Sequence, residues 1–359
     1  MAKDYINLDE TIFDVWQKQE NISTSPNFGK KLFLSKLIFE ILKETNYSFG
    51  FHPTPVEVVR KKLGLDISYE KKLLTDAEYL DISYRKKLSE NAKLYEINNV
   101  SVININIDQV RFGLGISEFN ERGRFSLAHE LGHFIIRYIS NKFPEINEKY
   151  KFTQGNIEKL CDFIASEFLL PSEFIKNISL KELQNKLKSQ SYLNLDADIL
   201  SEKYFLLNIK VIESLRNCFD VSRFVILQQL HKSRILNEAE CGFIISFFNI
   251  DRKTKRYPAL RVYFSATPSW SFIPVNIKLS SLGLHSAINT FNEHKYNTAL
   301  RWKEKINIQE KERNKWNKNI AINSEGEHIL YQFSKNTNYL ITSFNCENPE
   351  KIVHQEGEK

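Results

Sequence analysis

Two histidines four residues apart, with a glutamate directly after the first, are the residues of this sequence best suited to metal chemistry. His129, Glu130 and His133 form the pattern His-Glu-x-x-His. Residues four apart lie on one face of a helix, so both imidazole rings can bind a single zinc ion at about 2.0–2.1 Å. Glu130 projects beside the rings, where its carboxylate would take a proton from water that the metal acidifies. The pattern therefore predicts a metal-dependent hydrolase with Glu130 as its base.

A catalytic zinc ion usually has a third protein ligand, and Glu158 is the best candidate. Glu158 opens a helical pattern that ends at Pro171. Asp162 follows one turn later and is predicted to accept the second N–H of a ligating histidine, which fixes the tautomer of that histidine. Cys161 is interpreted as a small core residue and not as a ligand. The competing carboxylates are Glu145, Glu148 and Glu167.

The elements around the motif must hold these side chains in place. Apolar residues recur at helical spacing from Glu121 to Tyr138, so the motif is predicted to lie on a helix. Residues 30–45 and 55–64 are predicted helices, and residues 99–107 alternate apolar and polar side chains as a strand does. At the edge of a sheet, such a strand could bind a peptide through its main chain. An internal strand that only supports the helix is an equal alternative.

Two segments of the chain resemble the ImmA/IrrE family of zinc metallopeptidases. The first, Arg124 to His133, reads R-F-S-L-A-H-E-L-G-H and matches the family pattern without gaps. The second runs from Glu158 to Pro171 and departs from the pattern by apolar exchanges, including Cys161 where alanine is usual. It keeps Glu158, Asp162, Ala165, Leu169 and Pro171 and differs at Cys161, Ile164, Phe168 and Leu170.

The resemblance is specific over residues 53–171 and implies both a fold and an activity. The fold is of the α+β class, a zincin-like helical domain with a small sheet. Family members bind zinc and typically cleave a partner protein, often a helix-turn-helix repressor, which switches on genes of mobile elements or stress responses. For this chain the resemblance implies one zinc ion, and a repressor or antitoxin-like substrate in a mobile-element, phage-defence or stress response. Mn²⁺ and Fe²⁺ remain alternatives to zinc, because two histidines and a carboxylate can also bind them.

Three domains are predicted. Residues 1–187 form the metallopeptidase domain with its helical N-terminal part, residues 188–237 a helix-turn-helix-like segment, and residues 238–359 an α+β module for sensing or docking. The boundary at residue 188 begins a polar run, and Ser179 with Glu182 forms a capping box just before it. In the last module, residues 242–250, 259–264, 329–333 and 339–344 are predicted strands and residues 282–291 a helix.

The helix-turn-helix-like segment gives an alternative mode of action, which is contact with DNA. Helices are predicted over residues 211–219 and 223–230, with Ser222 as the N-cap of the second. Simple packing of the two helices is the favoured interpretation, because one arginine with a few glutamines makes a thin basic face. Residues that would contact nucleic acid are Arg223, Gln228, Gln229, His231 and Lys232. In the last module, the basic turn at residues 252–256 could bind phosphate, but a solvated turn is the simpler interpretation. The aromatic side chains Tyr263, Trp270 and Phe272 could line a pocket, but a place in the core is favoured.

Composition predicts a cytoplasmic protein. An apolar content of 42% over 359 residues is enough for proper cores. The 4 cysteines include no C-x-x-C pair, which favours a reducing compartment. The first ten residues carry charges throughout, and no apolar run reaches the roughly 18 residues of a membrane span. The 50 basic residues are offset by 44 acidic ones, so the net charge of +6 permits nucleic-acid binding without requiring it.

Two functions are consistent with these patterns. In the first, the protein is a zinc endopeptidase in which His129, His133 and Glu158 hold the metal. In the second, it is a non-proteolytic regulator that binds DNA or a protein partner through its later domains and has a structural metal site. The intact Glu130 favours the first, because a structural site needs no base. Tyr138 and Tyr150 are candidates for stabilising the oxyanion, and neither stands out.

Overall fold

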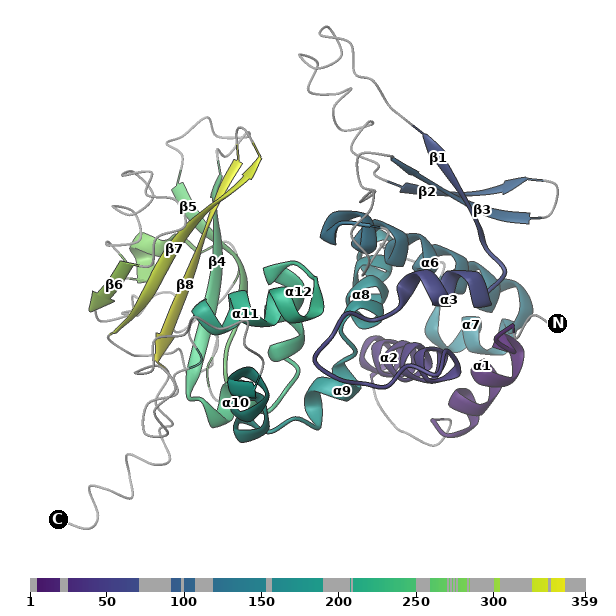
Figure 1. Cartoon of the computed structure of the whole chain (residues 1–359), viewed down its shortest axis with the longest axis horizontal. Coiled ribbons are helices and arrows are strands. Elements are labelled where there is room, and N and C mark those ends of the chain that lie inside the picture. Colours follow the sequence, from purple (N-terminus) through teal and green to yellow (C-terminus); the bar gives the residue numbers. More distant parts are fainter. Residues whose placement is uncertain are drawn as a thin grey trace, which may run out of the picture. The chain divides into compact units, whose positions relative to one another are not determined.

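The computed structural model divides by its internal contacts into two compact units (Figure 1). The first unit consists of Met1–Ile175 and Arg216–Gln229, and the second of Lys176–Leu215 and Leu230–Lys359. Each is described by itself, and the domain boundaries at residues 188 and 238 stay predictions. The residues that the structure describes are 5–19, 25–70, 92–97, 100–106, 119–152, 157–189, 207, 209–249, 259–269, 271, 273, 275, 277–282, 284, 300–303, 325–334 and 337–345.

The first unit is built mainly of helices, and the longest of them carries the histidine motif. This helix, α6 (Glu121–Lys142), begins where the Asn120 side chain accepts a hydrogen bond of 2.8 Å from the backbone N–H of Gly123. Fully buried Leu127, Leu131 and Ile135 repeat every four residues and turn one face of α6 to the core. The other helices are α1 (Leu8–Gln17), α2 (Pro26–Glu44), α3 (Val56–Lys62), α7 (Pro144–Tyr150), α8 (Ile157–Leu169), α9 (Ser172–Lys176) and α12 (Arg223–Leu230).

A three-stranded sheet contacts α6. Its order is β1 (Asp66–Glu70), β3 (Val100–Asn106), β2 (Ala92–Ile97), with β1 parallel and β2 antiparallel to β3. The predicted strand at residues 99–107 is confirmed as β3, and it is the internal strand of the described sheet. Both β2 and β3 contact α6, and in the described residues β2 is an edge.

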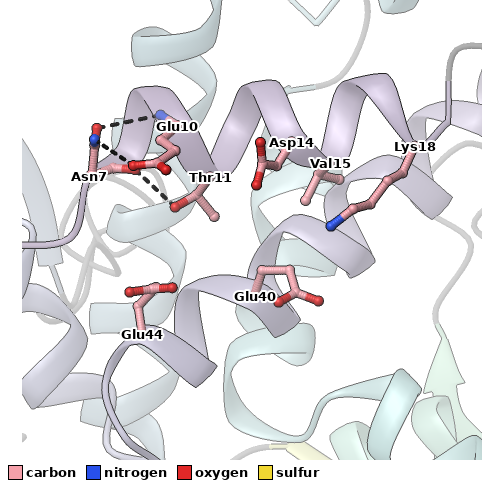
Figure 2. A pocket seen from close by; sticks show the side chains of 8 residues that line it. All are labelled: Asn7, Glu10, Thr11, Asp14, Val15, Lys18, Glu40 and Glu44. Carbon is pink, nitrogen blue, oxygen red and sulfur yellow. Dashed lines mark hydrogen bonds between the residues drawn. The ribbon is translucent and has the colours of Figure 1, made fainter.

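Helix α1 is fastened to the C-terminal half of α6. The Tyr138 hydroxyl donates a hydrogen bond of 2.6 Å to Asp9, and the Lys142 ammonium lies 3.5 Å from the same carboxylate. Burial and this carboxylate raise the pKa of Tyr138 to about 12. A cavity of about 280 Å³ lies between α1 and α2, and half of the residues that line it are acidic (Figure 2). It is lined by Asn7, Glu10, Thr11, Asp14, Val15, Lys18, Glu40 and Glu44.

A buried carboxylate joins α2, α8 and α9. Glu167 is fully buried, and its Oε2 accepts hydrogen bonds from the Ser35 hydroxyl at 2.9 Å and from the Ser172 hydroxyl at 2.9 Å. It also accepts the backbone N–H of Ser172 at 3.0 Å, which satisfies a donor at the start of α9. Glu167 therefore has a structural role. This carboxylate, a competing candidate for the metal in the sequence, bonds to α2 and α9 instead.

A buried arginine joins the start of α6 to the turn between α11 (Ile209–Phe219) and α12. The Arg124 guanidinium is fully buried and donates to the backbone carbonyls of Thr54 at 2.8 Å, Phe219 at 3.0 Å and Asp220 at 2.6 Å. The Asp220 carboxylate lies 3.5 Å from it. The predicted helix pair is confirmed, and through Arg124 its connecting turn is part of the first unit.

The second unit contains a five-stranded antiparallel sheet. Its order is β5-β4-β8-β7-β6, so β4 pairs with β8 across a long stretch of sequence. The capping box before α10 (Leu180–Ser189) is confirmed, because Ser179 and Glu182 each bond the backbone N–H of the other at 3.2 and 2.8 Å. The strands are β4 (Cys241–Asn249), β5 (Ala259–Ala266), β6 (Leu300–Lys303), β7 (Glu325–Ser334) and β8 (Thr337–Asn345), with α13 (Ile235–Glu238) before them.

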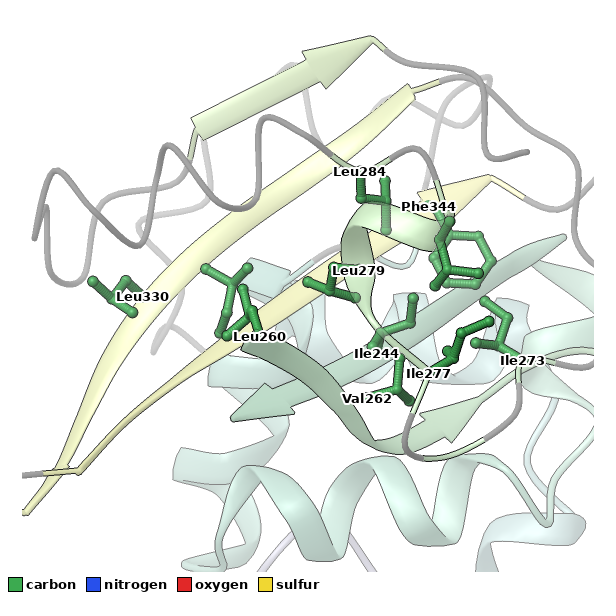
Figure 3. Close-up of a cluster of buried hydrophobic side chains, with 11 residues drawn as sticks. Ile244, Leu260, Val262, Ile273, Ile277, Leu279, Leu284, Leu330 and Phe344 are labelled. Carbon is green, nitrogen blue, oxygen red and sulfur yellow. The ribbon is translucent and has the colours of Figure 1, made fainter. Parts of the chain in front are cut away.

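Apolar side chains of β4, β5, β7 and β8 and of the segment after β5 form a core cluster of the second unit (Figure 3). Ile244, Val262 and Leu340 are fully buried, and the short 3₁₀ helix at Leu279–Leu282 packs its leucines into the same cluster. Tyr263, interpreted above as core, is exposed on β5, because alternate residues of a strand face opposite sides. The predicted basic turn, Trp270, Phe272 and most of the predicted helix at 282–291 lie outside the described residues.

The fold as a whole confirms the predicted α+β class, with a helical metal domain and small sheets. Among the described residues, none of the helices combines the length and apolar character that crossing a membrane requires.

Candidate metal centre

The two histidines of the motif lie together, as predicted. The ring centroids of His129 and His133 are 4.9 Å apart, and both side chains are partly buried on α6. Burial lowers the pKa of His129, but the hydrogen bond with Asp162 and the neighbouring carboxylates outweigh it and raise that pKa above its ordinary value. For His133, burial and the adjacent His129 lower the pKa, which favours the neutral ring that a metal needs.

Glu158 meets both histidines at the distances that a shared ion requires. Its Oε2 lies 3.2 Å from His129 Nε2, and its Oε1 lies 3.6 Å from His133 Nε2. Metal bonds of about 2.0–2.1 Å at tetrahedral angles place nitrogen and oxygen ligands about 3.3 Å apart. The Glu158 side chain is 71% exposed, so this ligand would approach an ion from the solvent side. Two imidazoles and one carboxylate are a donor set that fits zinc.

Asp162 lies beside the His129 ring, where it can fix the tautomer of that histidine. Its Oδ1 is 3.0 Å from Nδ1 of His129, on the opposite side of the ring from Glu158. With a proton on Nδ1 donated to this carboxylate, Nε2 is left with its lone pair for a metal. The structure therefore brings the predicted orienting pair, His129 and Asp162, into hydrogen-bond contact.

Asp162→Ala is expected to weaken zinc affinity by about 10–100-fold, because the His129 ring loses the partner that fixes its tautomer and orientation. Competition against a chromophoric chelator would measure this affinity. The matched Asp162→Asn variant keeps an acceptor oxygen at the same place, so it should retain more affinity than the alanine variant. Equal affinity in all three proteins would contradict the assignment.

Glu130 points to the sheet and is nearly buried. Its Oε2 accepts a hydrogen bond of 2.7 Å from the backbone N–H of Leu94, and the residue is only 7% exposed. Backbone groups of an antiparallel strand point alternately toward and away from the partner strand. The Leu94 N–H bonds to Glu130, so it points away from β3, the partner of β2. The outer edge of β2 therefore faces the helix that carries the metal ligands.

A glycine in the motif lets the two ligand-bearing helices approach each other closely. A Cβ atom added to Gly132 would lie 3.2 Å from Cα of Cys161 and 3.4 Å from its Cβ. The close neighbour is backbone, so the helix itself would have to move to make room. Gly132 thus brings the face of α8 that carries Glu158 and Asp162 to the histidines.

Gly132→Val is expected to lower the free energy of unfolding by about 1–3 kcal/mol through overpacking and to weaken zinc binding, because α8 must move away from α6. Thermal unfolding with and without zinc would measure both effects. The control is Asn141→Val, an exposed site of the same helix. Because glycine is a poorer helix former than valine, helix propensity does not account for the loss expected at Gly132. Similar losses in the two variants would show that the helix contact is not responsible.

Cys161 is buried, as predicted, and it also lies beside the motif histidines. Ligand atoms of His129, His133 and Cys161 all lie within 4.8 Å of one another. This trio omits Glu158, whose carboxylate oxygens lie 3.2 and 3.6 Å from the Nε2 atoms of the two histidines, so Glu158 and Cys161 are both candidate ligands. The spacing in the sequence could have indicated this position, because Cys161 follows Glu158 by three residues and residues three apart are neighbours on a helix.

Several other predicted residues lie away from the histidines. Tyr138 is bonded to Asp9 of α1, and Tyr150 packs between the rings of Trp16 and Phe33, so neither is placed to stabilise an oxyanion. Glu145 and Glu148 are exposed on α7.

The residues considered for nucleic-acid contact do not share one exposed face. Gln229 is fully buried, and Gln228 accepts a hydrogen bond of 2.7 Å from the Ser166 hydroxyl of α8. Both amides are therefore directed into the first unit, because α12 is joined to the metal-binding helices. Arg223, in the first unit, and Lys232, in the second, are partly exposed. Contact of these two residues with DNA stays a prediction.

A helix with His-Glu-x-x-His beside a second helix with an orienting carboxylate defines a metal centre of the metallopeptidase class. A family model described as the IrrE N-terminal-like domain, of the peptidase family M78, matches residues 117–230, which contain all of these residues. Residues 117–230 therefore form a domain of the ImmA/IrrE type. The resemblance of the two sequence segments to that family is confirmed.

Solved structures of other proteins are also similar to this chain, and one of them is a regulator. A solved structure called a Mycobacterium tuberculosis transcriptional regulator is similar with a TM-score of 0.43 and 12% sequence identity, over 94% of this chain and 80% of that chain. No curated protein matches the sequence.

Proposed function

We propose that this protein is a zinc-dependent endopeptidase that cleaves a specific partner protein. The observation that carries the proposal is the position of the Glu158 carboxylate, which lies 3.2 and 3.6 Å from the Nε2 atoms of the two motif histidines. A base, Glu130, follows the first of these histidines in sequence. The peptidase family to which the domain belongs supports the same reaction.

The residues of the centre have distinct roles in hydrolysis. When bound, zinc would supply Lewis acidity, which polarises a peptide carbonyl and lowers the pKa of water. His129, His133 and Glu158 would hold the ion, and Asp162 would keep the His129 ring oriented. The Glu130 carboxylate takes a proton from the attacking water and later gives it to the leaving amine.

The outer edge of β2 is the proposed binding site for the substrate backbone. An extended peptide would pair there by main-chain hydrogen bonds, which places it between β2 and α6. The hydrogen bond from the Leu94 N–H to Glu130 supports this site, because it brings the edge of β2 next to the proposed base. The scissile segment is therefore an extended stretch of the partner rather than a folded helix.

The proposed partner is a helix-turn-helix repressor or an antitoxin-like protein, whose cleavage would control a mobile-element, phage-defence or stress response. Family membership supports this part of the proposal. A repressor also provides the exposed linkers in which an extended scissile segment is found.

The test combines metal content with cleavage. Wild-type protein and His129→Ala are purified, their zinc is measured, and each is incubated with repressor-like proteins encoded beside the gene, followed by mass spectrometry of the fragments. We expect one zinc ion per chain and a single cut with the wild type, and neither with His129→Ala. Wild-type protein that binds zinc but cuts neither these proteins nor a library of unfolded peptides would overturn the endopeptidase assignment.

A further inference from the structure

Cys161 lies inside the metal centre, and the hydrolysis proposed above makes no use of it. Its side chain is fully buried on the face of α8 that packs against Gly132. Its ligand atom and those of His129 and His133 all lie within 4.8 Å of one another. A buried sulfur is thus available to the same ion for which Glu158 is the candidate ligand on the exposed side.

The distances are compatible with coordination after a small adjustment. Zinc bonds of about 2.3 Å to sulfur and about 2.0–2.1 Å to nitrogen place these atoms about 3.5 Å apart at tetrahedral angles. Starting from at most 4.8 Å, the thiol and the rings must approach each other by about 1.3 Å or less. The Gly132 contact prevents α8 from coming closer as a whole, so the approach is made by the side chains.

We propose that Cys161 is a ligand of the same metal ion, bound as a thiolate from the buried side of the centre. When the metal–sulfur bond forms, the thiol proton passes to solvent, so charge and atoms balance. Cys161, His129 and His133 then give three protein ligands. When the exposed Glu158 carboxylate moves in from the solvent side as the fourth, the centre has the closed arrangement of a structural zinc site. Catalysis then requires the thiolate to leave the ion, and the resting protein is a latent enzyme.

The inference rests on the metal centre and not on the proposed peptidase activity. A thiolate ligand would be a property of this chain, because the family pattern has alanine where Cys161 stands. It should also change the preference among metals, since soft thiolate ligands favour ions such as Cd²⁺ over harder ones such as Mn²⁺.

Cobalt spectroscopy of the full chain tests the proposal directly. Co²⁺ is titrated into the Glu130→Gln protein, in which every proposed ligand is intact and hydrolysis is blocked. A cobalt–thiolate bond gives an intense charge-transfer band in the near ultraviolet, which nitrogen and oxygen ligands do not give. We expect this band in Glu130→Gln and its loss when Cys161→Ala is added, while the weaker visible bands of bound cobalt persist.

Two controls make the outcome specific. Cys218→Ala, at a partly exposed cysteine of α11, should keep the band, and Glu158→Ala should keep it as well because sulfur and both histidines remain. Circular dichroism must show that each variant is folded, and Cys161→Ser serves as a second variant if alanine fails to fold. A spectrum without the band, or one that survives loss of Cys161, would overturn the proposal.

The results separate this inference from the proposed function. A thiolate band together with no cleavage of any substrate would overturn the peptidase and leave the ligand assignment in place. Cleavage without the band would do the reverse. If both hold, Cys161→Ala should cleave its substrate faster than the wild type, because the fourth position is open from the start. Protein that binds no cobalt in any form would overturn both.

Discussion

Glu130→Gln is expected to lower kcat for cleavage by about 10²–10⁴-fold, the usual contribution of a general acid–base group, with zinc still bound at one ion per chain. The glutamine amide cannot take a proton from water, but its oxygen can still accept the hydrogen bond from the Leu94 N–H. The fold and the ligand residues therefore stay as they are. Zinc content and single-turnover cleavage of the partner protein would be measured on the same preparation.

A matched control for this prediction is Glu148→Gln, an exposed carboxylate on α7 that was a competing candidate by sequence. It removes the same charge from the protein and should change neither zinc content nor kcat. If Glu130→Gln kept wild-type activity, the base would have to be another group and the proposed roles would be wrong. If it lost zinc, Glu130 would be acting as a ligand.

Arg124→Met is expected to lower the free energy of unfolding of the first unit by about 3–5 kcal/mol, the cost of removing one partner from a buried charged pair. Methionine fills similar space, so the loss comes from polar groups. The carbonyls of Thr54, Phe219 and Asp220 each lose a donor, and the Asp220 carboxylate loses its cation. Hydrogen exchange of α6 amides in increasing urea would report this free energy for the first unit itself.

The control for Arg124 is Arg122→Met, two residues earlier on the same helix and exposed. Its effect should stay within about 0.5 kcal/mol, as for an ordinary surface substitution. Arg124→Lys should fall between the two, because one ammonium cannot reach three carbonyls that the planar guanidinium bonds together. Equal stability of Arg124→Met and Arg122→Met would show that the buried bonds contribute nothing net.

The metal centre was predictable from the sequence where its chemistry depends on helical spacing. His129, His133, Glu158 and Asp162 lie on helix faces at i, i+4 intervals, and local geometry fixes which of them point the same way. The predicted strand β3 followed from alternation of polar and apolar residues. Its internal position could not be predicted, because strand order depends on contacts between residues far apart in the chain.

Features that depend on packing between elements were missed for the same reason. Arg124 matched the family pattern, yet its acceptors on a distant turn could not be read from its neighbours. Cys161 was interpreted as core, and only its position opposite Gly132 shows that the same residue is both core and close to the metal ligands. The two glutamines of α12 were candidates for contact with DNA, but Gln229 is buried. Tertiary contacts decide which polar residues of a helix reach the surface.

The bonds of Arg124 have a consequence for the order of events during protein synthesis. Two of its carbonyl acceptors lie 95 and 96 residues later in the chain. At about 5–20 residues per second, the ribosome needs roughly 5–20 s to make that stretch. During this interval the Arg124 guanidinium on α6 lacks the carbonyl acceptors of Phe219 and Asp220. The helix can therefore reach its final stability, and the metal centre its final geometry, only after the turn at Asp220 has left the ribosome.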